Sequence, residues 1–456
     1  MHPNIGPLKQ LHIFNTLSRA MTSRLPHTAA ASAVKVDVSR YFSNPYTAQM
    51  LGENEKQILH DQETSLKRAH QLLHKCQRHY SKRTFQNDDF GSLYHGSLGV
   101  RVYLPWKLAA THRALGHKEQ ANQYLQDAQQ QAEKAVLSLS SRSYRRVTLL
   151  ESPWVGAKAL QIAIWNDLHQ HEKAQKEAHQ LAVQLAQSCT RLPSHENDVL
   201  YGRAGAVQAI LFLRRVLDNR QIGRESVWQI VQEIIQEGRR YAALHAQDAL
   251  SLLWEWHDTK YLGAAHGVVG ILHTLLCLEA SELTALDEQY GLHKAIQETL
   301  KGLNRYCWPS GNLDRSIKSS HSVDRLVHWC HGATGHILLL AKAHEVYDDK
   351  AYQDQAVRLA RDVVWERGLL LKGVGLCHGI SGSTYALMAA ARGNDPTITE
   401  RHVHAFARFA HDNLHYLEAI PDEPYCLYNG VAGLCNLFLD IAVHGCQARF
   451  PLYDHF

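Results

Sequence analysis

The segment Val327-His328-Trp329-Cys330-His331-Gly332-Ala333-Thr334-Gly335 is followed, about one repeat later, by Gly375-Leu376-Cys377-His378-Gly379-Ile380-Ser381-Gly382. Both segments contain Cys-His-Gly-x-x-Gly, which places a thiol and an imidazole beside a glycine turn. Thiolate sulfur and imidazole nitrogen are donors that zinc favours. The sequence therefore predicts one zinc site whose ligands come from two turns that the fold must bring together.

The same type of turn recurs along the chain, as Gly-x-x-Gly followed by an apolar run. Besides the two Cys-His turns it occurs in Tyr94–Gly99, Leu200–Gly205, Ala265–Gly270 and Leu427–Gly433. A seventh instance, Glu151–Gly156, fits if Pro153 replaces the first glycine. The turns are separated by roughly 47 to 65 residues, a spacing that is typical of helical-repeat architectures.

Two kinds of helical segment lie between these turns. Charged and apolar residues alternate with helical periodicity in Gln57–Arg78, Glu119–Leu139, Glu172–Cys189, Ser226–Leu244, Lys294–Asn304 and Lys350–Val364. The runs directly behind the turns are uniformly apolar: Ala206–Leu213, Ile271–Leu278, His336–Ala341, Ser383–Ala391 and Leu434–Ala442. Because such runs need burial on all sides, we expect them to form an inner layer inside the amphipathic helices. The sequence predicts an all-α, double-layered α/α toroid of seven helical hairpins, with the turns gathered at one end.

The glycines of the turns have two readings. The first glycine can take positive φ or bring backbone close to a neighbour at a helix start, and the second allows close helix packing. Packing alone explains Gly96/Gly99, Gly202/Gly205 and Gly430/Gly433 without chemistry. Likewise, a buried cysteine is usually a small apolar residue. Two Cys-His copies at equivalent repeat positions favour a metal site, for which Cys330, His331, Cys377 and His378 offer more donors than needed.

Composition narrows the function classes. The 456 residues carry a net charge of +4 and no dense Lys/Arg block, so a nucleic-acid partner is not expected. The nine cysteines form an odd, scattered set rather than a disulfide framework, which favours a reducing compartment, the cytoplasm. No run of 18 apolar residues exists, so no transmembrane helix is expected.

The first 36 residues differ from the rest. Met1 to Val36 contains no Asp or Glu but has Lys9, Arg19, Arg24 and Lys35. This composition suits either a disordered extension or a mitochondrial transit peptide, and membrane association of the chain is also left open. We therefore expect an N-terminal extension over residues 1–36 and a single toroid domain over residues 37–456.

The ordered set of motifs resembles the lanthionine synthetase C-like family, most closely its eukaryotic members. The resemblance covers Arg40 to Phe456 and is densest in Tyr201-Gly202-Arg203, Gly263-Ala264-Ala265-His266-Gly267, Pro309-Ser310-Gly311-Asn312, Leu326–Gly332 and Lys372–Gly379. It implies a seven-fold α/α toroid with one zinc ion at its mouth, held by Cys330, Cys377 and His378 but not by His331. The fourth position would take water or the thiol to be activated.

The resemblance also implies a reaction. The thiol, glutathione in eukaryotic members, would add to dehydroalanine or dehydrobutyrine residues of peptides and proteins, or to other electrophiles. His266 and Lys372 match candidate catalytic residues, an acid and a cation suited to an enolate. Arg40 and Lys372 match residues that contact glutathione. The alternatives are a histidine hydrogen-bonded at a helix start and a solvated loop lysine.

The chain departs from the family pattern near its C-terminus. Ala419 stands where better-known relatives place an arginine against glutathione, and Asn429 stands where they often have glutamate. These changes motivate the alternative of a zinc-containing, glutathione-binding signalling scaffold with little catalysis. The sequence leaves open whether a protein kinase or another signalling partner docks. A toroidal glycoside hydrolase is disfavoured because no turn offers an obvious pair of carboxylates.

Overall fold

The fold was examined in a computed structural model that describes residues 36–46, 62–81, 85, 91–139, 146–318, 323–393, 395–421 and 423–455. The chain divides after Lys35, and all described residues belong to the unit Val36–Phe456. The predicted extension over residues 1–36 lies outside the described residues except for Val36, so its disordered or targeting character stays a prediction. The start of the predicted helix Gln57–Arg78 also lies outside them.

The described residues are helical, with isolated β-bridges and no strand ladder among them. The predicted amphipathic segments form the outer helices α4 (Gln62–Tyr80), α6 (Lys118–Leu139), α8 (His171–Cys189), α10 (Arg224–Leu244), α13 (Leu292–Leu303) and α15 (Lys350–Leu359). Two outer helices were not predicted, α12 (Ala280–Tyr290) and α18 (Glu400–Asp412). The predicted apolar runs form the inner helices α9 (Arg203–Val216), α11 (Val268–Leu276), α14 (Ala333–Tyr347), α17 (Ile380–Ala391) and α20 (Val431–His444), and the inner layer also contains α5 (Leu104–Ala114) and α7 (Pro153–Asp167). The predicted all-α class is confirmed.

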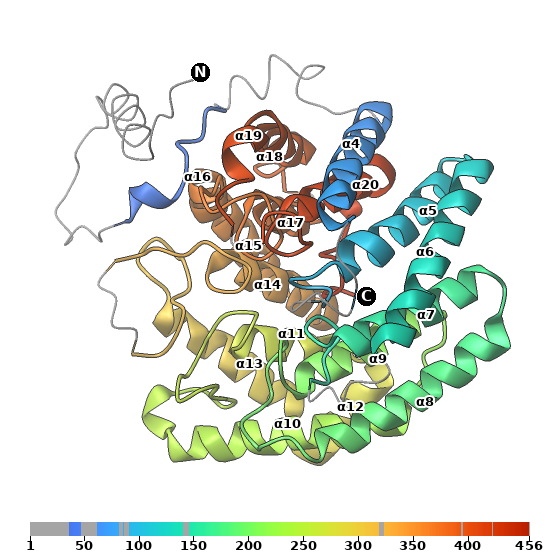
Figure 1. Ribbon diagram of the computed structural model, residues 1–456. Coiled ribbons are helices and arrows are strands. Elements are labelled where there is room, and N and C mark those ends of the chain that lie inside the picture. Colours follow the sequence, from blue (N-terminus) through green and yellow to red (C-terminus); the bar gives the residue numbers. More distant parts are fainter. Residues whose placement is uncertain are drawn as a thin grey trace. The chain divides into compact units, whose positions relative to one another are not determined.

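The inner helices form a closed ring within Val36–Phe456 (Figure 1). From α7 to α20 each contacts the next in chain order, and α20 returns to α5. The contact between α5 and α7 runs through η2 (Gly99–Tyr103), the turn of helix that leads into α5. The outer helix α4 packs on α20, so the first outer element covers the last inner one. This is the expected double-layered α/α toroid.

The seven turns meet at one end of this ring, where backbone hydrogen bonds join neighbours. The bonds run from Tyr94 N to Leu150 O (3.0 Å), Leu149 N to Gly205 O (3.2 Å), Val199 N to Ala265 O (3.2 Å), Trp329 N to Cys377 O (2.9 Å), Cys377 N to Tyr428 O (2.7 Å) and Tyr428 N to Tyr94 O (3.3 Å). Between the fourth and fifth turns the backbones touch, because a Cβ on Gly263 would lie 1.9 Å from Cys330 O. The ring of turns is therefore closed around the mouth.

The glycines that start the inner helices act mainly through close approach. Gly332 has φ 114°, as one reading of the motif expects. Gly267, the equivalent residue before α11, has an extended φ of −127°, and a Cβ there would lie 2.4 Å from Tyr261 O. Positive φ is therefore a property of the Cys330 turn, whereas lack of space for a side chain is shared more widely.

Charged groups buried within the layers are paired. Both terminal nitrogens of Arg214, on α9, donate to the carboxylate of Glu282, on α12, at 2.8 Å. Both side chains are buried, so each compensates the other's charge in a site that water does not reach. This pair joins the inner helix α9 to the outer helix α12.

No single helix among the described residues is long and apolar enough to cross a membrane, although one pair, α11 and α12, passes that test together with a bend of 116°.

Candidate metal centre

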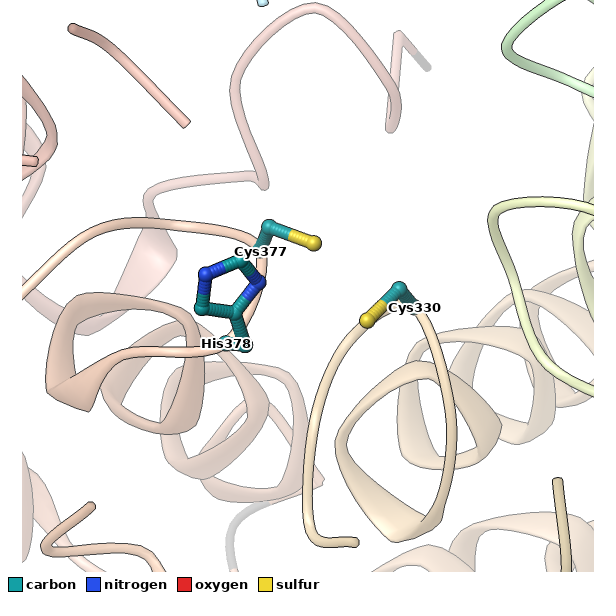
Figure 2. Close-up of side chains that lie close together, drawn as sticks. All are labelled: Cys330, Cys377 and His378. Atoms are coloured by element: carbon teal, nitrogen blue, oxygen red, sulfur yellow. The ribbon is translucent and has the colours of Figure 1, made fainter. Parts of the chain in front are cut away.

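Cys330, Cys377 and His378 converge at the mouth of the ring. Their ligand atoms all lie within 4.8 Å of one another. Figure 2 shows the two sulfurs pointing toward each other from the turns before α14 and α17, with the His378 ring beside them. Cys377 is 1% exposed and Cys330 is 8% exposed. Residues 47 positions apart thus form one compact donor set.

The Cys330 turn is held by a polar network that the sequence motif Pro309–Asn312 supplies. Asn312 Oδ1 accepts from Ala333 N (2.7 Å), which caps the start of α14. Asn312 Nδ2 donates to Asp324 Oδ1 (2.6 Å), and Arg367 Nη1 donates to Asp324 Oδ2 (2.7 Å). Since Asn312 and Asp324 are buried, this network fixes the turn with little freedom.

The donor set suits zinc. Two sulfurs and one imidazole leave one position of a tetrahedron open, and Zn–S bonds of about 2.3 Å place two sulfur ligands about 3.8 Å apart, inside the observed spread. Burial raises the pKa of the Cys377 thiol well above its usual value. A buried thiol of this kind is stable as a thiolate only beside a compensating cation, which a bound metal ion would provide.

Two further side chains contact the sulfurs. The Tyr94 hydroxyl donates to Cys377 Sγ at 2.7 Å, and His328 Nδ1 lies 3.9 Å from Cys330 Sγ. Burial, and next the charge of Cys377, raises the pKa of Tyr94 well above its usual value, so the hydroxyl keeps its proton. Burial lowers the pKa of His328 well below its usual value, so its ring is neutral. Neither residue was predicted to contact the site, although His328 lies in the first Cys-His segment and Tyr94 begins the first turn.

His266, the predicted acid, forms a pair with a carboxylate. Its Nδ1 lies 2.5 Å from Asp198 Oδ2. Its ring stacks on Trp256, with centroids 3.9 Å apart and planes 7° apart, and lies parallel to Tyr201 at 5.6 Å. Asp198 is 2% exposed and also accepts from Tyr201 N at 2.9 Å. The carboxylate therefore fixes the orientation and tautomer of His266. Asp198 was not predicted, although it stands three residues before Tyr201 in the same turn.

His331 lies between His266 and the donor set. The Tyr261 ring is 5.9 Å from His266 and 5.6 Å from His331, measured between centroids. Burial, with smaller effects from the charges of His266 and His378 among others, lowers the pKa of His331 to about 3. His331 does not join the donor set. That His331 is not a metal ligand stays a prediction.

Arg40 and Lys372 approach the centre from adjacent segments. Leu371 N donates to Arg40 O at 3.0 Å, and Phe42 N donates to Leu369 O at 2.8 Å, so the start of the described chain lies along the loop that leads to Cys377. The charges of Arg40 and Lys372 both contribute to the lowered pKa of His328. The Lys372 side chain is exposed, and Arg40 Nε has no hydrogen-bond partner among the described residues. Two separate basic residues thus flank the donor set.

The two departures from the family pattern lie near the same loop and turn. A Cβ on Gly373 would lie 2.7 Å from Pro421 Cγ, so the segment that holds the exposed Ala419 adjoins the Lys372 loop. Asn429 is buried, and its Oδ1 has no hydrogen-bond partner among the described residues. Ala419 is therefore an exposed residue of a segment that adjoins the Lys372 loop.

A second group of potential ligands, His273, Cys277 and Asp454, is fully buried elsewhere in the fold. Asp454 lies 3.5 Å from Lys342 Nζ and 3.3 Å from Arg449 Nη1. Although burial raises it, these charges and that of His273 bring the pKa of Asp454 well below its usual value. Since the carboxylate is already compensated by cations, this group anchors the C-terminus and does not suit a metal ion.

Comparisons with known proteins show the family of the chain. A family model described as "Lanthionine synthetase C-like protein" matches residues 88–454. The chain is 30% identical over 325 residues to "Glutathione S-transferase LANCL1" of Danio rerio, an alignment that covers 70% of this chain and 76% of that protein. It is 34% identical over 261 residues to "LanC-like protein GCL1" of Arabidopsis thaliana, which covers 56% of this chain and 57% of that protein. The chain belongs to the lanthionine synthetase C-like family.

Proposed function

We propose that this protein adds the thiol of glutathione to electron-poor alkenes, in particular to dehydroalanine or dehydrobutyrine residues of peptides and proteins. The observation that carries the proposal is the convergence of the Cys330, Cys377 and His378 donor atoms within 4.8 Å at the mouth of the toroid. The similarity to a relative named as a glutathione S-transferase supports the choice of thiol and reaction class.

Cys330, Cys377 and His378 would hold one zinc ion. Zinc in such a set lowers the pKa of a coordinated thiol from about 8.5 and so supplies a thiolate nucleophile at neutral pH. Tyr94 and His328 contact the two ligand sulfurs and hold them in place.

Side chains around the mouth of the toroid would carry out the proton transfer and stabilise the charge that the addition creates. Addition forms a C–S bond at the β-carbon and leaves negative charge on the α-carbon and its carbonyl oxygen. His266, oriented by Asp198, would donate the proton that forms the new C–H bond, and the proton lost by the thiol restores the balance. Lys372 would stabilise the enolate charge or, with Arg40, bind the carboxylates of glutathione.

The test is an adduct assay. Zinc-loaded protein is incubated with glutathione and a dehydroalanine peptide, and the product is followed by mass spectrometry. We expect a glutathione adduct that is lost in Cys377→Ala and retained in Cys189→Ala, which removes an equally buried thiol from the outer helix α8. No adduct above the uncatalysed background, or an equal yield from Cys377→Ala, would contradict the proposal.

A glutathione-binding scaffold without turnover is the second candidate, favoured by the missing arginine at Ala419. Isothermal titration calorimetry separates the two. Glutathione binding that is intact in protein without adduct formation supports the scaffold, and turnover well above background excludes it. We also propose a reducing compartment such as the cytoplasm, which the nine free cysteines support.

A further inference from the structure

Tyr94 contacts the donor set from the first turn of the ring, which closes against the seventh turn. It lies in the first turn, before η2, whereas Cys377 lies in the sixth, 283 residues later. The Tyr94 side chain is 5% exposed, and its hydroxyl donates to Cys377 Sγ at 2.7 Å. The bond exists only because the seventh turn brings the first and sixth together.

The position of the Tyr94 ring is fixed by its neighbours. Its backbone N donates to Leu150 O (3.0 Å), and its backbone O accepts from Tyr428 N (3.3 Å). Its ring stacks on the Tyr428 ring, with centroids 4.7 Å apart and planes 25° apart. The Tyr94 hydroxyl therefore has little freedom to leave the sulfur.

The two cysteines of the donor set have unequal surroundings. Cys377 Sγ accepts a short hydrogen bond from a hydroxyl, whereas Cys330 Sγ lies 3.9 Å from the ring nitrogen Nδ1 of His328. A hydrogen bond to a ligand thiolate withdraws charge from sulfur, so that less charge passes to the metal ion and the sulfur itself becomes a weaker nucleophile. Both effects suit a site that must activate one thiol while its own thiolates face an electrophile.

We infer that Tyr94 is a positioning residue of the metal centre, whose hydroxyl stabilises the Cys377 thiolate and limits the charge that this sulfur donates to the metal ion. This role rests on the proposed function, because it acts on the ion that the donor set is proposed to hold. It assigns different tasks to the two cysteines, with Cys330 as the stronger donor of charge.

The test replaces zinc by cobalt(II) and compares Tyr94→Phe with the matched control Tyr428→Phe. Each variant removes one buried hydroxyl and keeps the stacked rings, so folding is checked by circular dichroism in both. In Tyr94→Phe we expect the sulfur-to-cobalt charge-transfer band to move to lower energy, and the affinity for zinc, measured by chelator competition, to fall about 10- to 100-fold. The control should keep the parent spectrum and affinity.

Each other result has a defined meaning. An unchanged cobalt spectrum and zinc affinity in Tyr94→Phe would overturn the role of Tyr94 and leave the proposed function standing. Equal changes in both variants would also overturn it, because they would show an effect on packing rather than on the sulfur. If the parent protein binds neither cobalt nor zinc, the proposed function fails and this inference fails with it. As a second readout, Cys377 in zinc-loaded Tyr94→Phe should be alkylated by iodoacetamide faster than in the parent protein. An equal rate also counts against the role.

Discussion

Replacing Asp198 by asparagine removes the charge that faces His266 and leaves the local fold in place. Asp198 Oδ1 accepts from Tyr201 N at 2.9 Å, a bond that an asparagine carbonyl can keep. Asp198 Oδ2 lies 2.5 Å from His266 Nδ1, and an amide nitrogen there cannot accept from the imidazole. The substitution therefore removes one charge-assisted hydrogen bond from a carboxylate that is 2% exposed.

The size of the effect follows from the strength of that bond. A hydrogen bond to a charged group contributes about 1.5–3 kcal/mol, and its loss in the transition state lowers a rate roughly 10- to 150-fold. We expect Asp198→Asn to reduce the rate of adduct formation by this factor at saturating glutathione, because His266 loses both its tautomer and the partner of its protonated form. The affinity for zinc should not change.

The assay is single-turnover adduct formation followed by mass spectrometry between pH 6 and pH 9. Asp167→Asn, at the end of α7, is the matched control, because Asp167 pairs with Arg113 near the surface. A rate for Asp198→Asn within twofold of the parent across this range would refute the assignment of His266 as an acid held by Asp198.

Three other predictions concern stability and binding. Arg214→Met removes the arginine partner of the buried Glu282 carboxylate and should lower the free energy of unfolding, measured in urea, by about 3–5 kcal/mol. Adding Glu282→Leu in a double variant should restore part of this loss, and a loss below about 1 kcal/mol in Arg214→Met would contradict the pairing. Burial lowers the pKa of His336 to about 4, so between pH 6.5 and pH 4 the unfolded chain binds a proton that the folded chain does not. The free energy of unfolding should therefore fall as the pH is lowered through this range, and His336→Gln should make its slope against pH shallower by about 1.4 kcal/mol per pH unit. An unchanged slope would argue against the buried neutral ring. Lys372→Ala should weaken glutathione binding in calorimetry by about tenfold, corresponding to about 1.4 kcal/mol, and an unchanged dissociation constant would remove Lys372 from the binding site.

Much of the fold was predictable because short local sequence patterns determine where each helix begins and which face it buries. Each inner helix follows a glycine turn, and each outer helix carries its own amphipathic period, so the segments Glu119–Leu139 and Glu172–Cys189 agree with α6 and α8 within one residue. The repeated Cys-His pair pointed to Cys330, His331, Cys377 and His378 as potential donors, and only the family resemblance left His331 out. Repeated motifs can be recognised from the sequence alone.

The contacts that complete the site were not predictable in the same way. Tyr94 meets Cys377 across 283 residues, and Asp198 meets His266 across 68, so no local period joins them. Their pairing depends on the order in which the turns close into a ring. The role of the first glycine of each turn could not be predicted either, because crowding at Gly267 and a positive φ at Gly332 both require the same residue type, glycine.

Zinc-edge X-ray absorption spectroscopy, with and without glutathione, tests the central claim most directly. The account predicts one zinc per chain with two sulfur ligands and one imidazole before addition, and three sulfur ligands after it, as the thiol takes the open position. A coordination sphere that keeps two sulfurs in the presence of saturating glutathione would contradict the claim that this centre activates the thiol by binding it.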